Sequence, residues 1–182
     1  EGYKLFPLSG ISNSKTVHCN ENGYYSIYQS DRYGFNNPDE EWNNKIVEYI
    51  VVGDSFVAGE CVNRPNDIPS NLRKLSNKSV LNLAYSSNGP LIEYATLREY
   101  LNLNAKKVLW FYFEGNDLRN LVSEEKNDIL LNYLNDPNFS QNLKLKQDEI
   151  NSLANDLIKI ERKKERIKKE KDNFIYNFIN FI

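Results

Sequence analysis

Methionine is absent from this chain of 182 residues, histidine occurs once and cysteine only twice. These counts exclude a histidine-rich metal site and a disulfide-dense scaffold. No apolar run is long enough to cross a bilayer, so we expect no membrane span in this chain. A net charge of −2 excludes a general nucleic-acid binder. Without methionine the chain does not begin at a translation start, and we expect that a signal, an anchor or a disordered stretch precedes it.

The composition provides for one packed domain, with 40% hydrophobic and 26% charged residues. Residues 1–45 are polar and rich in turn signals, and they predict an N-terminal extension packed on the domain. Within it we expect a short hairpin of 24–28 against 32–35. An α/β core is predicted over 46–140 and a long amphipathic helical segment over 141–182.

The predicted core alternates strands with helices. Three short apolar runs predict strands at residues 46–52, 79–83 and 108–113. Apolar residues at helical spacing predict helices over 67–77 and 90–103. This alternation is typical of right-handed βαβ units and a parallel sheet. Trp110 and the aromatic residues around it are expected in the core of the third strand.

The last third of the chain is predicted to be helical, with one helix over 123–134 and a long one from 141 to about 173. The long helix has an apolar stripe of Ile150, Leu153, Leu157, Ile160 and Ile167. Its middle mixes both charges at helical spacing, which favours a solvated face over a basic patch for nucleic acid or lipid. Residues 174–182 are apolar and uncapped, so we expect the chain to continue beyond them.

Each predicted strand is followed by a short polar motif. These motifs are Gly53-Asp54-Ser55, the segment 82–89 (Asn-Leu-Ala-Tyr-Ser-Ser-Asn-Gly) and Gly115-Asn116-Asp117. In an open parallel sheet the carboxyl ends of the strands meet at one edge, where ligands bind. We therefore predict that Ser55, Ser87 and Asn116 surround one small cleft.

The chemistry predicted for this cleft is acyl transfer by a serine nucleophile. Ser55 would attack, and Gly53 would permit the tight backbone turn before it. The backbone N–H groups of Ser55 and Ser87 and the side-chain amide of Asn116 would form an oxyanion hole. Such fixed neutral donors are each worth roughly 3 kcal/mol in the transition state. Asp117 is expected to be a structural hydrogen-bond acceptor.

In these blocks the sequence resembles the SGNH (GDSL-type) hydrolase superfamily, and in particular a bacterial branch whose members carry an upstream membrane segment. Gly53-Asp54-Ser55 matches the first family block and Gly115-Asn116-Asp117 the third, while Ser87 stands where the second block has glycine. The resemblance implies a three-layer α/β/α flavodoxin-like sheet, here truncated at its C-terminus. It also implies a serine esterase or O-acyltransferase that acts on O-acyl esters, including those of glycans, without a metal or organic cofactor.

One family element is missing, the C-terminal Asp-x-x-His that supplies the general base. The only histidine, His18, precedes the first predicted strand and is expected to be a surface residue. An alcohol without a base is not activated, so we expect this chain alone to be inactive, as a fragment or a degenerate relative.

Other interpretations stay open. A non-catalytic module could keep the cleft and bind a glycan or a partner protein. Gly-Asp-Ser could also be a turn in which Asp54 or Ser55 caps a helix. A phosphate-binding loop is disfavoured, because the Gly-x-Gly-x-x-Gly pattern and the Walker lysine are both absent.

Cys19 and Cys61 lie in polar, turn-rich surroundings, where free buried thiols are not expected. We predict that they form a disulfide that joins the N-terminal extension to the loop after Ser55. Such a bond requires an oxidising compartment, so an extracytoplasmic location is expected. The alternative is two unrelated thiols in a cytosolic protein.

Overall fold

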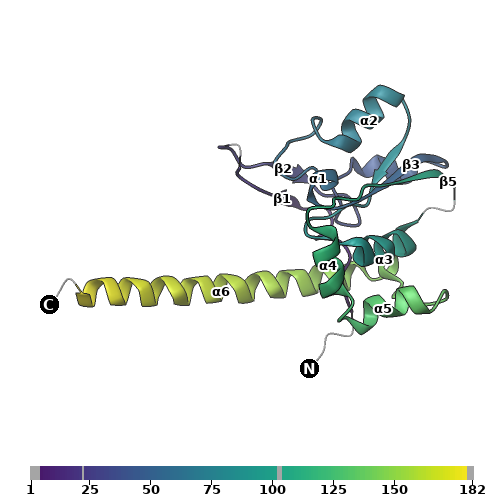
Figure 1. Ribbon diagram of the computed structural model, residues 1–182. Helices are drawn as coiled ribbons and strands as arrows, with labels where there is room; N and C mark the ends of the chain where they lie inside the picture. The colour runs from purple at the N-terminus through teal and green to yellow at the C-terminus, as the bar shows by residue number, and fades with distance from the viewer. Residues whose placement is uncertain (1–4, 22, 102–103, 180–182) are drawn as a thin grey trace.

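The computed structural model describes residues 5–21, 23–101 and 104–179, with side-chain detail as far as residue 170 (Figure 1). It is a mixed α/β structure with a three-stranded parallel sheet in the order β4–β3–β5. The apolar end predicted over 174–182 lies outside the described side chains. Within the described residues, no helix combines the length and apolar character needed to cross a membrane.

The central strand β3 (Val47–Val52) is flanked by β4 (Val80–Asn82) and β5 (Ala105–Trp110). Ile50 pairs with Leu81 on one side and with Val108 on the other. Ile50, Val51 and Val52 are fully buried. This agrees with the prediction that a short β-branched run forms a buried parallel strand.

Helices pack against both faces of the sheet. On one face Ile50 and Val52 share a core with Leu91 and Ala95 of α3 (Pro90–Tyr100) and with Leu130 of α5 (Asp128–Asn135). On the other face the core contains buried residues of α1 (Ser55–Ala58), and Leu72 of α2 (Ile68–Ser76) packs against it. In Figure 1, α2 lies on the opposite side of the sheet from α3 and α5. Both predicted helices are thus confirmed, but α3 ends at Tyr100, before the predicted residue 103.

The N-terminal segment differs from the predicted hairpin. Strand β1 (Lys15–Val17) pairs antiparallel with β2 (Ile27–Gln29), so the hairpin expected between 24–28 and 32–35 is wrong. Residues 32–35 instead turn around the carboxylate of Asp31, which accepts hydrogen bonds from the backbone N–H groups of Tyr33 and Phe35, both at 2.9 Å. The turn buries Phe35 in the core beside the sheet.

The third strand corrects a second prediction. β5 begins earlier and ends earlier than 108–113, and its aromatic residues are not core. Trp110 is 44% exposed and Tyr112 54% exposed. The two outer strands of the described sheet differ in this respect, because β4 is buried along its length while β5 is mostly exposed.

The helical prediction for the last third also needs correction. The single helix expected over 123–134 is two helices, α4 (Asp117–Glu124) and α5. The break is caused by Asn127, whose Oδ1 accepts from the N–H groups of Ile129 and Leu130 at 3.0 and 3.2 Å and so caps α5.

Two 3₁₀ helices complete the described elements, η1 (Asp39–Asn43) before the sheet and η2 (Leu143–Leu145) after α5. The long helix α6 (Gln147–Ile179) follows η2, so it begins later than the predicted residue 141. It projects from the body of the molecule (Figure 1).

Candidate functional site

The motif Gly53-Asp54-Ser55 leaves the central strand at the middle of the sheet's carboxyl edge. A Cβ at Gly53 would come within 2.6 Å of Val57 Cγ2, so this position has no room for a side chain. Asp54 is buried, and its Oδ1 accepts from Phe56 N at 3.0 Å as the N-cap of α1. Ser55 is the half-buried first residue of this single helical turn. The capping role that the sequence left open therefore belongs to Asp54.

The third motif lies beside the first. Asn116 Nδ2 donates to Asp54 Oδ2 at 3.4 Å, which brings the predicted oxyanion-hole amide next to the residue that precedes Ser55. Asp117 is fully buried and its Oδ2 accepts from Phe113 N at 2.7 Å, which closes the loop between β5 and α4. Burial raises the pKa of Asp117, and the nearby Asp54 carboxylate raises it further. A Cβ at Gly115 would come within 2.7 Å of the Phe113 ring, so a side chain there would force this loop to shift.

The second motif is held on the other side of the first. Tyr85 N donates to Gly53 O at 3.4 Å, which continues the β3–β4 pairing past the strand ends. Asn82 is buried, and the side-chain amide of Asn37 contacts both its N–H and its C=O, at 2.8 and 2.9 Å. The N-terminal extension thereby fixes the start of this loop.

Ser87 has a left-handed backbone conformation with φ of +66°, a region that glycine enters without strain. It is exposed and lines a cavity of about 260 Å³ together with Asn120, Glu124 and other residues of α3 to α5. Its role beside Ser55 stays a prediction.

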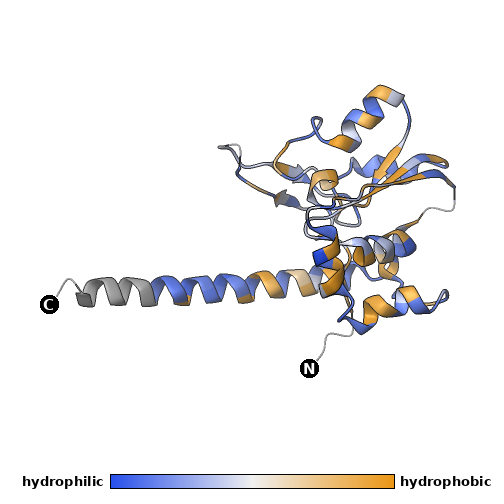
Figure 2. Cartoon of the chain, viewed as in Figure 1, coloured by the Kyte–Doolittle hydropathy of each residue, from blue (hydrophilic) through white to orange (hydrophobic). Residues whose placement is uncertain are grey.

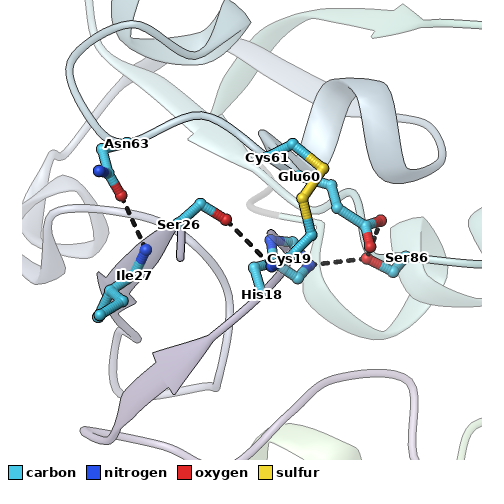
Figure 3. The surroundings of a disulfide bond; sticks show 8 residues. All are labelled: His18, Cys19, Ser26, Ile27, Glu60, Cys61, Asn63 and Ser86. Carbon is cyan, nitrogen blue, oxygen red and sulfur yellow. Dashed lines mark hydrogen bonds between the residues drawn. A yellow bond between two sulfur atoms is a disulfide. The ribbon is translucent and has the colours of Figure 1, made fainter. Parts of the chain in front are cut away.

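His18, expected on the surface, is half-buried against the same loop (Figure 3). Its Nε2 lies 2.7 Å from Ser86 Oγ, and that hydroxyl donates to Glu60 Oε2 at 2.7 Å. Since the carboxylate can only accept, Nε2 must carry a proton and donate to Ser86. Burial lowers the pKa of His18, and the Glu60 carboxylate opposes this shift.

Cys19 and Cys61 form a disulfide, with their Cα atoms 5.0 Å apart (Figure 3). The bond has a local consequence, because His18 precedes Cys19 and Glu60 precedes Cys61 in the sequence. Joining the cysteines therefore brings the imidazole and the carboxylate to the same loop. This adjacency is the signal from which the His18–Ser86–Glu60 cluster could have been predicted.

Two buried glutamates near the loops were not predicted from the sequence. Glu93 on α3 is 1% exposed and accepts a hydrogen bond from Trp110 Nε1. Burial raises its pKa to about 8, and the carboxylates of Asp117 and Asp54 add to this shift. Glu124 accepts from Gly89 N at 2.6 Å and so holds the end of the second motif at the start of α3. These contacts join residues far apart in the sequence, and no local pattern signals them.

Comparisons with known proteins identify no family for this chain, so any function must be inferred from the geometry of the site. No protein-family model matches this chain, and no curated protein or solved structure matches it significantly. Among the described residues, no group of three or more His, Cys, Asp and Glu side chains is arranged to hold a metal ion.

Proposed function

We propose that this chain carries the serine cleft of an SGNH-type esterase or O-acyltransferase built on a flavodoxin-like sheet. The observation that supports the proposal most strongly is the 3.4 Å contact between Asn116 Nδ2 and Asp54 Oδ2. It joins the motifs that follow β5 and β3, and the hydrogen bond from Tyr85 to Gly53 adds the motif after β4. Ligands of open parallel sheets bind at this edge.

In the proposed reaction Ser55 Oγ attacks the carbonyl carbon of an O-acyl ester. A C–O bond forms, the carbonyl oxygen becomes an oxyanion, and Asn116 Nδ2 and backbone N–H groups donate to it. Collapse of this intermediate expels the alcohol and leaves Ser55 acylated. Water then completes hydrolysis, or an acceptor hydroxyl completes acyl transfer. The Ser55 proton must pass to a general base, a role for which this chain offers no family-type residue.

We propose an extracytoplasmic location because the chain carries the Cys19–Cys61 disulfide. In such a compartment acylated glycans are a suitable substrate class. This assignment of place and substrate depends on the disulfide and not on the serine cleft, so it can fail separately.

The second candidate function is a non-catalytic module that binds a glycan or a protein in the same cleft. The contact of His18 Nε2 with Ser86 Oγ at 2.7 Å favours it, because the single imidazole of the chain donates its Nε2 proton there. A chain that only binds needs neither a base nor a free nucleophile.

Acylation of the intact chain by a short-chain aryl ester distinguishes the two functions. We expect slow acyl transfer to Ser55, accelerated by added imidazole and located by peptide mass mapping. Ser55→Ala should abolish the modification, while the matched variant Ser86→Ala should retain it. Acylation that survives Ser55→Ala would refute the nucleophile assignment, and no acylation even with imidazole would favour the binding module.

A further inference from the structure

The long helix α6 presents an exposed apolar stripe to solvent. With 33 residues it is about 50 Å long. Its start is anchored, since Ile150 is buried in the core. Every residue from 155 to 170 is exposed, including Ile160 at 46% and Ile167 at 41%. Leu157, at 43%, also lines a pocket with residues of β1 of its own chain. Figure 2 shows this projecting part mainly hydrophilic, with few apolar positions. Most helices in proteins are stabilised by packing of such a face.

The apolar positions of α6 follow a seven-residue repeat. Alternating steps of three and four connect Ile150, Leu153, Leu157, Ile160, Lys164 and Ile167, which are positions a, d, a, d, a and d. The same steps continue in the sequence to Lys171, Phe174 and Phe178, so lysine occupies two successive a positions, 164 and 171. A repeat sustained over several heptads is the pattern of a coiled coil.

We propose that α6 pairs with α6 of a second copy of this chain in an antiparallel two-stranded coiled coil. The two-fold axis passes between Glu165 and Arg166, so that Lys164 of each copy lies opposite Ile167 of the other. The lysine at position a then faces an apolar residue, along which its aliphatic stem can pack.

The charges beside the seam determine this alignment. In an antiparallel pair, e positions face e positions and g positions face g positions. Here Glu161 at e lies opposite Lys168 of the second copy, and Lys163 at g lies opposite Glu170. The symmetry repeats both contacts, so all four flanking pairs have opposite charges. All four side chains are exposed. Glu161 and Glu170 make ion pairs within the helix, with Lys164 at 2.6 Å and Arg166 at 3.7 Å, which the contacts across the seam would supplement or replace.

A parallel arrangement is disfavoured by the same residues. There, position g of one helix faces position e of the next heptad in the other helix. Asp156 would meet Glu161, and Lys163 would meet Lys168. Lys164 and Lys171, both at position a, would also lie directly opposite their own copies. Both flanking pairs and two core layers would then join like charges, which destabilise helix pairs.

Neighbouring antiparallel alignments fail for a similar reason. If the register shifts by one heptad so that the two-fold axis lies closer to the body, Lys163 of one chain lies opposite Lys163 of the other, and Glu161 lies opposite Glu161. If the register shifts by one heptad in the other direction, Lys168 lies opposite Lys168 of the other chain and Glu170 opposite Glu170. Both alignments therefore bring like charges together. A shift of two heptads toward the body requires Ile150, which is already buried in the core of its own chain.

Sedimentation velocity on the full chain tests the association. We expect a dimer, and Lys168→Glu should raise its dissociation constant by about tenfold, because two attractive pairs become repulsive. The matched variant Lys169→Glu makes the same charge change at outward position f and should leave the dimer intact. Glu161→Lys combined with Lys168→Glu should restore it. A chain that stays monomeric at the highest attainable concentration, or equal weakening by both single variants, overturns the proposal.

Disulfide trapping tests the orientation. A mixture of Lys164→Cys and Ile167→Cys chains should cross-link between the two variants under mild oxidation, while each variant alone should not. Ready cross-linking of Ile167→Cys to itself indicates a parallel pair and overturns the antiparallel alignment. Circular dichroism on each variant establishes that its helix content is unchanged, which separates loss of pairing from loss of folding.

Discussion

Two corners of this molecule hold different parts of the proposed acyl-transfer site. At one corner Ser55 opens α1, and Asn116 lies beside it through Asp54. At the other corner, after the end of α1, His18 contacts Ser86, which in turn donates to Glu60, next to the disulfide. The first corner has the proposed nucleophile and a neutral donor, and the second has the single imidazole of the chain.

The difference shows that placing the right residue types near one loop does not assemble a catalytic unit. A serine becomes a nucleophile when a base accepts its proton at hydrogen-bond distance. At the second corner, His18 Nε2 donates to Ser86, so its lone pair resides on Nδ1. This atom is buried, and among the described residues it has no hydrogen-bond partner. The two corners should therefore respond independently to mutation.

Removing the disulfide should have the largest effect on stability. Cys19 and Cys61 are separated by 42 positions, and closing a loop of this length stabilises a fold by about 4 kcal/mol in the chain-entropy model. We expect the double variant Cys19→Ser/Cys61→Ser to lose about this much unfolding free energy in urea. Acylation of Ser55 under native conditions should be unchanged, and a parallel loss of acylation would show that the corners are coupled.

Asn116→Ala should slow acylation of Ser55 by about a hundredfold, since one oxyanion donor is lost. The rate of acyl incorporation, followed by intact mass, measures this effect. Asn132→Ala, at an exposed position of α5, is the matched control and should react at the normal rate. Equal rates for Asn116→Ala and the unmodified chain would exclude Asn116 from the oxyanion hole.

Glu93 should make stability fall as the pH rises. Its pKa is raised from 4.5 to about 8 in the fold, so the folded state holds the proton more tightly than the unfolded chain. The resulting stabilisation is complete below pH 4.5 and is lost as the pH rises through 8. Glu93→Gln should remove this dependence and be more stable than the unmodified chain at alkaline pH, by about 2 kcal/mol. Urea unfolding across this range measures it; an identical slope in both proteins would contradict the assignment.

His18 should produce the opposite and smaller dependence. Burial lowers its pKa below 6.5, so its contribution to stability is present above 6.5 and is lost as the pH falls through the folded pKa. His18→Gln should flatten the acid side of the stability profile and leave the alkaline side unchanged. If the acid slope persists in the variant, carboxylates and not His18 are responsible for it.

The sheet was predictable because its signals are local. The β-branched run of β3 and the helical spacing of α2 and α3 are properties of short segments. The exposure of Trp110 was not predictable, because an apolar run does not reveal which segments of the chain cover its strand. Asn127 ended a predicted helix through a capping bond that the apolar pattern does not encode.

The candidate site was predictable to a similar extent. Residues on strand ends, such as Ser55 and Asn116, follow from topology. The partners of His18 and the burial of Glu93 depend on long-range packing, so the sequence pattern alone did not indicate them. The disulfide between Cys19 and Cys61 was the one long-range contact with a simple chemical signal.

The central claim is that Ser55 and Asn116 share one reacting group. A crystal structure of the intact chain measures it directly, through the distance between Ser55 Oγ and Asn116 Nδ2. Both atoms must approach within about 3 Å of the same carbonyl group. We therefore predict that they lie less than about 8 Å apart on one open cleft. A larger separation, or a side chain packed between them, would contradict the account.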